Sequence, residues 1–135
     1  MAKYVLFSAV SGTVYLNGAA VAEARIERKY YWRWSKERAS DETTTDAQGR
    51  FSLKQIEVSS MSAWLPHEPY VEQSILVHYR GQQYEVWGYD KRNYSTNGEL
   101  DGKAIKLRIE LTLDLKRFGD PQYFGRAVGR FTLEP

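Results

Sequence analysis

Hydrophobic and polar side chains alternate without interruption over residues 105–115. The hydrophobic side chains occupy every odd position of this segment: Ile105, Leu107, Ile109, Leu111, Leu113 and Leu115. The even positions carry Lys106, Arg108, Glu110, Thr112 and Asp114. A repeat of two places one set of side chains on a buried face and the other in water, whereas a helix would spread the six hydrophobic residues around its circumference. The pattern therefore predicts one continuous β-strand over residues 105–115.

Shorter segments of the same kind, separated by turn residues, precede this strand. Residues 10–16 alternate up to the pair Asn17-Gly18, residues 75–79 alternate up to Arg80-Gly81, and residues 84–88 alternate again. Pairs of this type favour tight hairpin turns. No long segment has helical spacing, and aromatic residues, which suit sheet surfaces, make up 14% of the chain. We therefore expect an all-β fold, an antiparallel sandwich of seven to eight strands, in one domain over residues 1–135.

The charge and cysteine content restrict the function. Nineteen basic residues against seventeen acidic ones leave a net charge of +2, which is too balanced for a nucleic-acid footprint. The absence of cysteine excludes disulfides and thiolate chemistry. No apolar segment is long enough to span a bilayer, and the N-terminus does not resemble a secretory signal. We therefore expect a cytoplasmic protein without membrane insertion.

Residues 22–34 form the longest alternating segment, with small or apolar side chains at most even positions and Arg28 as an interruption. Thirteen extended residues span about 43 Å, roughly twice an ordinary strand. Either the strand bends and Tyr30, Trp32 and Trp34 cover one end of the core, or its distal half projects as a β-ribbon paired with residues 41–45. The second alternative exposes the aromatic residues as a contact patch beside Arg28 and Arg33.

A second aromatic segment lies in residues 62–70, where Pro66 and Pro69 prevent regular strand pairing. Its candidate contact residues are Trp64, His67 and Tyr70. One interpretation is a loop folded over an end of the sandwich, and the other is a proline-stiffened recognition loop. The Asn-, Ser- and Gly-rich residues 90–102 are expected to form the longest loop, a candidate for a mobile segment.

Two segments resemble a known family. Residues 11–26 (SGTVYLNGAAVAEARI) are similar to the opening of carboxypeptidase regulatory-like domains, and residues 44–53 (TTDAQGRFSL) match that family's T-D-x-x-G-x-F-x-L pattern. The resemblance implies a transthyretin-like β-sandwich in which Gly12 allows close backbone approach and Phe51 anchors a strand in the core. Family members are mostly structural or binding modules, so the resemblance implies a fold rather than a partner.

Catalytic and metal sites are not supported by the sequence. Hydroxyisourate hydrolase shares the transthyretin-like fold, but its C-terminal Tyr-Arg-Gly-Ser signature is reduced here to an internal Tyr79-Arg80-Gly81 followed by Gln82. The two histidines, His67 and His78, lack the close ligand spacing of zinc sites. Nucleophile elbows and glycine-rich phosphate loops are also absent. We expect no enzyme activity, no cofactor and no metal.

The sequence therefore predicts a non-catalytic protein-interaction module of a bacterial type, in the form of a secretion-system adaptor or a cognate toxin inhibitor. The type VI secretion version follows from the resemblance, because transthyretin-like domains resemble loading modules attached to contractile-system spikes. The alternative is a carbohydrate-binding sandwich that stacks exposed aromatics on sugar rings, and nucleic acid is disfavoured as a partner. The predicted partner-binding residues are Arg28, Tyr30, Trp32, Arg33, Trp34, Trp64, His67 and Tyr70.

Overall fold

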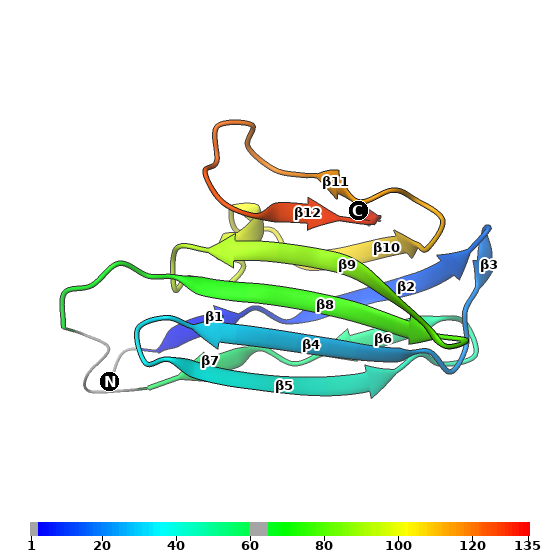
Figure 1. Ribbon diagram of the computed structural model, residues 1–135, viewed down its shortest axis with the longest axis horizontal. Helices are drawn as coiled ribbons and strands as arrows, with labels where there is room; N and C mark the ends of the chain where they lie inside the picture. The colour runs from blue at the N-terminus through cyan, green and yellow to red at the C-terminus, as the bar shows by residue number, and fades with distance from the viewer. Residues whose placement is uncertain (1–2, 60–64) are drawn as a thin grey trace.

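The computed structural model describes residues 3–59 and 65–135, which form two layers of β-sheet (Figure 1). The larger sheet has the strand order β11 (Lys116–Arg117), β12 (Ala127–Gly129), β9 (Gln82–Lys91), β8 (Val71–Tyr79), β4 (Arg25–Trp32) and β5 (Glu37–Thr44). The second sheet contains β13 (Phe131–Leu133), β10 (Ile105–Glu110), β2 (Val10–Leu16) and β3 (Ala19–Ala20), with β6 (Arg50–Leu53) also paired to β2. A two-stranded sheet joins β1 (Tyr4–Phe7) to β7 (Ile56–Val58).

The expected all-β sandwich is confirmed. Eight of the strands in the described residues are at least four residues long: β1, β2, β4, β5, β6, β8, β9 and β10. Pairing is antiparallel apart from β2 and β10, which run parallel. The helical element described is a short 3-10 turn, η2 (Gly98–Leu100). Inner-face residues of both sheets, among them Val14, Ile26, Ile75, Trp87 and Leu107, form one core.

Several local expectations are confirmed as well. The pairs Asn17-Gly18 and Arg80-Gly81 both lie at positive φ, in the turns of the hairpins β2–β3 and β8–β9. A Cβ at Gly12 would come within 2.5 Å of the Leu107 carbonyl oxygen, so this position requires glycine for the parallel pairing of β2 with β10. Phe51 is buried on β6, as the resemblance implies.

The predicted strand over residues 105–115 is too long, because β10 ends at Glu110. The Glu110 carboxylate accepts hydrogen bonds from the backbone N–H and hydroxyl of Thr112, and the Leu113 N–H donates to the Glu110 carbonyl. These bonds turn the chain. Leu111 is still buried, whereas Leu113 and Leu115 are exposed. The alternation continues for three hydrophobic positions beyond the strand, because a repeat of two in the sequence does not reveal a turn stabilised by a side chain.

The predicted projecting β-ribbon is also wrong. The central strand β4 pairs with β5 on one side and β8 on the other, over all its residues from Arg25 to Trp32. The predicted thirteen positions shrink to a strand of eight, since Ala22 precedes it and is exposed, while Trp34 lies in the turn that follows. The strand is therefore part of the larger sheet over its whole length and does not project from it as a separate ribbon.

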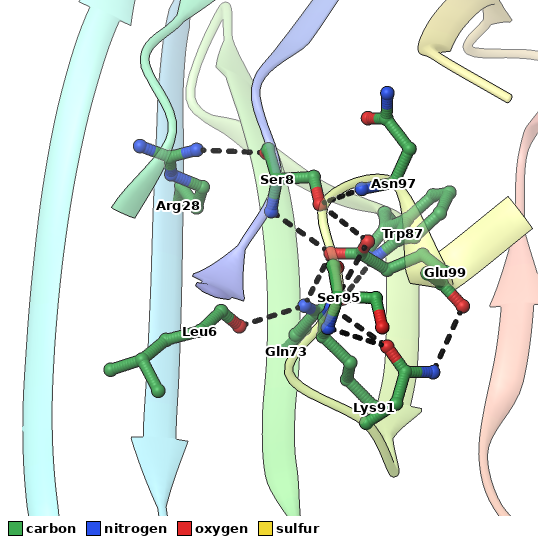
Figure 2. Close-up of polar contacts among 11 residues, drawn as sticks. Leu6, Ser8, Arg28, Gln73, Trp87, Lys91, Ser95, Asn97 and Glu99 are labelled. Carbon is green, nitrogen blue, oxygen red and sulfur yellow. Dashed lines mark hydrogen bonds and ion pairs between the residues drawn. The ribbon is translucent and has the colours of Figure 1, made fainter. Parts of the chain in front are cut away.

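Residues 92–104 form a loop broken by the short η2 turn, as the composition of residues 90–102 predicts, but part of this loop is buried. Strand β9 continues to Lys91, and the segment after it inserts Glu99 into the sandwich (Figure 2). The Glu99 carboxylate accepts hydrogen bonds from the Ser8 N–H at 2.9 Å, the Ser8 hydroxyl at 2.6 Å and the Gln73 side-chain amide at 2.9 Å. Lys91 donates to the Ser95 carbonyl and to Asn93, which holds the segment to the end of β9. A buried polar network thus anchors this segment.

Candidate interaction surface

The turn between β4 and β5 meets the segment before β8 at one end of the larger sheet (Figure 1). The Arg33 N–H donates to the Tyr70 carbonyl at 3.1 Å, which fixes the two segments side by side. Aromatic, arginine and leucine side chains gather there. We call this surface the turn patch, and it consists of Arg33, Trp34, Leu65, His67, Tyr70 and Arg92.

The Trp34 indole stacks on the imidazole of His67, with ring centroids 4.1 Å apart and planes 14° apart. His67 Nδ1 lies 2.7 Å from the Leu65 carbonyl oxygen, and Nε2 lies 2.7 Å from the Tyr94 hydroxyl. A carbonyl oxygen only accepts, so Nδ1 carries the hydrogen. The Tyr94 hydroxyl, which contacts Nε2, accepts a hydrogen bond from Trp32 Nε1 at 2.9 Å, and this bond joins the surface stack to the core. The imidazole is therefore held in one orientation beneath Trp34.

Two guanidinium groups lie over the ring of Tyr70. The Cζ atom of Arg33 is 3.7 Å from the ring centroid, and that of Arg92 is 4.7 Å from it. Arg33 Nε also donates to Glu72 at 3.2 Å, and this hydrogen bond raises the pKa of the Arg33 guanidinium. The Tyr70 hydroxyl donates to Asp90 at 2.9 Å, while burial and this acceptor raise the pKa of the phenol. Both groups are thus held in one protonation state, with Arg33 charged and Tyr70 neutral.

The turn patch combines exposure with restraint. The Trp34 residue is 36% exposed and the Arg33 side chain 52% exposed. Their ring and ion-pair contacts already restrict the rotamers, so little side-chain entropy remains to be lost on contact with a partner. Trp, Tyr and Arg are also the residues that contribute most to binding energy at protein interfaces. The arrangement suits recognition of another surface.

Three of the predicted contact residues, Tyr30, Trp32 and Arg28, are buried in the structure and lie outside the turn patch. Tyr30 and Trp32 are 8% and 3% exposed, so their expected exposure as contact residues is wrong. Both lie on the inner face of β4, which the second layer covers. The alternative interpretation, in which these aromatics belong to the core, holds for both of them, while Trp34 alone of the three reaches the surface. Trp64 lies outside the described residues.

Arg28 is likewise buried rather than on the surface, with its side chain fully excluded from solvent. Its guanidinium donates to Asp41 on β5 through Nε at 2.9 Å and a terminal nitrogen at 2.6 Å. A further hydrogen bond of 2.6 Å reaches the Lys54 carbonyl, and the group lies 4.9 Å from the Phe7 ring centroid. Figure 2 shows its contact with the Ser8 carbonyl. Arg28 therefore joins β4 to β5 and the small sheet.

Sequence reasoning missed Tyr94 and Arg92. Tyr94 connects Trp32, His67 and Tyr4, whose ring meets it edge-on at 4.8 Å between centroids. The available signal was an aromatic residue inside an otherwise polar loop, since such a side chain is costly to leave in water. No spacing pattern links residue 92 to residue 70, so the position of Arg92 required the fold.

The second histidine, His78, lies on β8 in the larger sheet, outside the turn patch. His78 Nε2 lies 2.9 Å from a Glu27 carboxylate oxygen, and hydrogen bonding to His78 lowers the pKa of Glu27. Within residues 3–59 and 65–135, no group of three or more His, Cys, Asp or Glu side chains could hold a metal ion. In the same part of the chain, no helix has the length and apolar character needed to cross a membrane.

Comparison with known proteins gives one match. A family model described as a domain of unknown function (DUF6795) matches residues 10–114. No curated protein and no solved structure matches the chain. The matched residues include the whole turn patch and end before β11.

Proposed function

The chain belongs to the DUF6795 family, and we propose that it acts as a non-catalytic protein-interaction module whose contact surface is the turn patch. The observation that carries this proposal is the half-exposed Trp34, stacked on an imidazole whose two nitrogens are both hydrogen-bonded. A tryptophan held in this way presents a rigid apolar surface. A partner that covers it gains the burial of the indole at a small cost in entropy.

The arginines define the chemistry of the partner. Arg33 and Arg92 both lie over the ring of Tyr70. Among the described residues, Glu72 is the carboxylate that is hydrogen-bonded to Arg33. A carboxylate on the partner would gain a charge-assisted hydrogen bond from this pair. The partner surface therefore combines an apolar recess for Trp34 with acidic groups at its rim.

The cellular role follows from the resemblance of residues 11–26 and 44–53 to carboxypeptidase regulatory-like domains. That resemblance supports a bacterial adaptor of a contractile secretion system, with a cognate toxin inhibitor as the second version. In both roles a small sandwich binds one protein tightly without changing it chemically. The cytoplasm remains the compartment in which we propose that it acts.

Affinity capture with matched variants tests the proposal. Tagged wild-type protein should retain a partner that Trp34→Ser and Arg92→Ser both lose. Arg108→Ser is the matched control, because Arg108 also lies over a tyrosine, Tyr15, at 4.0 Å, but on the second sheet. Circular dichroism and a melting curve confirm that each variant is folded. Equal capture by wild-type protein and both turn-patch variants would refute the turn patch as the contact surface.

Carbohydrate binding is the alternative that Trp34 would also serve, because an indole that is 36% exposed can stack on a sugar ring. A glycan array, followed by titration of the hit with tryptophan fluorescence as the signal, separates the two functions. Saturable glycan binding that Trp34→Ser abolishes would favour the carbohydrate function. Without such binding, loss of protein capture by the same variant supports the interaction module.

A further inference from the structure

Phe124 is the most exposed large hydrophobic residue in the described part of the chain, with 86% of its surface in solvent. It lies in the loop between β11 and β12, at the edge of the larger sheet opposite β5 (Figure 1). The turn patch lies at the same end of this sheet, and Asp90 lies between the two regions, where its carboxylate accepts hydrogen bonds from the Tyr70 hydroxyl and the Arg126 N–H. Phe124 itself is not a member of the turn patch, and the proposed function does not use it.

The loop around Phe124 is fixed rather than loose. Arg117 donates hydrogen bonds to the carbonyls of Tyr123 and Gly125, on either side of Phe124. The Tyr123 ring stacks on Tyr89 of β9, with centroids 5.3 Å apart and planes 12° apart. Gly125 has φ 151°, and a Cβ there would come within 2.9 Å of the Tyr123 ring. These contacts hold the backbone of Phe124 in place while its side chain points into water.

A hollow of about 290 Å³ adjoins the same loop. Its apolar lining includes Tyr89, Phe118, Tyr123 and Leu133, and Leu133 is itself 49% exposed. An apolar cavity of about 150 Å³ can take up benzene, so the hollow is large enough for a phenyl ring. Phe124 and a recess that suits it thus lie on neighbouring parts of one surface.

The charges around the two features have opposite signs. Arg117 and Arg126 lie on the Phe124 side, where Arg126, whose side chain is 44% exposed, forms an ion pair with Glu85. The exposed carboxylates of Asp101 and Asp120 line the hollow, where Lys103 is the single basic group. A partner that offers an aromatic ring flanked by arginines would match the hollow. This chain carries such a ring itself.

We propose that two copies of the chain associate through this surface, with Phe124 of each copy inserted into the hollow of the other. A two-fold axis needs one self-complementary patch on each copy, and the loop supplies the ring and part of the recess together. Arg117 and Arg126 of one copy then approach Asp101 and Asp120 of the other, which favours this pairing over a purely apolar contact. Trp34 and His67 of the turn patch are not part of this contact.

Sedimentation velocity over a range of protein concentrations tests the association. Wild-type protein should shift from monomer to dimer as concentration rises, and Phe124→Ser should weaken the dimer by about 30-fold or more, since two buried rings are lost per dimer. Leu113→Ser is the control, because Leu113 is also exposed but does not line the hollow, and it should leave the dimer unchanged. A wild-type chain that stays monomeric at millimolar concentration, or a Phe124→Ser variant that dimerises equally well, overturns the proposal.

Photo-crosslinking locates the contact. A crosslinking amino acid placed at position 124 should join two copies, and peptide mapping should find the link at Tyr89, Phe118 or Leu133. Links to other regions of the second copy would overturn the reciprocal insertion. Binding of monomeric wild-type protein to phospholipid vesicles, lost in Phe124→Ser, would identify a membrane as the occupant and also overturn it. None of these readouts depends on Trp34, so the Trp34→Ser variant tests the turn patch separately from the dimer.

Discussion

Lys91 and Glu99 face each other inside the sandwich, with Nζ and Oε1 3.6 Å apart and both side chains wholly excluded from solvent. Burial lowers the pKa of the Lys91 ammonium, and the Glu99 carboxylate opposes that shift. The pair is not isolated, because Glu99 also accepts from Ser8 and Gln73, and the Gln73 amide oxygen accepts from Trp87 Nε1 at 3.1 Å. Charges are tolerated in this core because hydrogen bonds surround them.

Lys91→Met should therefore destabilise the protein by about 3–5 kcal/mol, because it leaves the Glu99 carboxylate buried without its cation. Urea unfolding followed by tryptophan fluorescence measures the loss. In the double variant with Glu99→Gln, the buried charge is removed as well. Its cost should fall short of the sum of the two single changes by about 0.5–3 kcal/mol. Strictly additive costs would show that the two side chains do not interact.

The two neighbouring tryptophans should behave differently. Trp32→Ser empties a core position that is 3% exposed and removes a hydrogen bond to Tyr94, so it should cost about 3–5 kcal/mol. Trp34→Ser removes one exposed stack on His67 and should cost about 0.5–1.5 kcal/mol. Thermal melts of the two single variants make the comparison. Similar losses would place both indoles in the core and remove Trp34 from the turn patch.

The sequence predicted those features that depend on a repeat of two and on turn chemistry. The hairpins at Asn17-Gly18 and Arg80-Gly81, and the burial of Phe51, follow from local pattern. The pattern cannot show which face of a strand a second layer will cover, so Trp32 and Trp34 looked equivalent although one lies in the core. Polar residues raised a further difficulty, because Glu99 lies in a sequence typical of an exposed loop. Its hydrogen-bond donors come from residues far away in sequence, such as Ser8 and Gln73.

The position at which β10 ends can be tested by comparing a substitution within the strand with one beyond it. Ile109 is wholly buried on this strand, and Ile109→Ala should cost about 2–5 kcal/mol through the cavity that it leaves. Leu113 continues the same alternation but lies beyond the strand and is 36% exposed, so Leu113→Ala should cost less than about 1 kcal/mol. Urea midpoints of the two variants give the comparison. A large loss for Leu113→Ala would restore the longer strand that the alternation predicts.

Glu110 should make stability depend on pH in the acid range. Partial burial opposes its ionisation, but hydrogen bonds from Thr112, Gly18 and Asn17 outweigh burial and lower its pKa from 4.5 to about 2. The Gly18 N–H donates to this carboxylate at 2.7 Å and the Asn17 N–H at 3.1 Å, so the group joins β10 to the β2–β3 turn.

The direction of the pH dependence follows from the protonation of Glu110 in the unfolded chain and in the folded chain. The unfolded chain takes up a proton at Glu110 near pH 4.5, whereas the folded chain keeps the carboxylate ionised until about pH 2. The stabilisation is thus fully present above pH 4.5 and is lost as pH falls towards 2.

Glu110→Gln lacks this contribution at every pH. The stability difference between wild-type protein and Glu110→Gln, measured by urea unfolding, should therefore shrink steadily over this interval. Asp114→Asn, a change at an exposed carboxylate on the adjoining segment, is the matched control for the loss of a surface carboxylate. A wild-type advantage over Glu110→Gln that stays constant from pH 4.5 to pH 2 would contradict the lowered pKa.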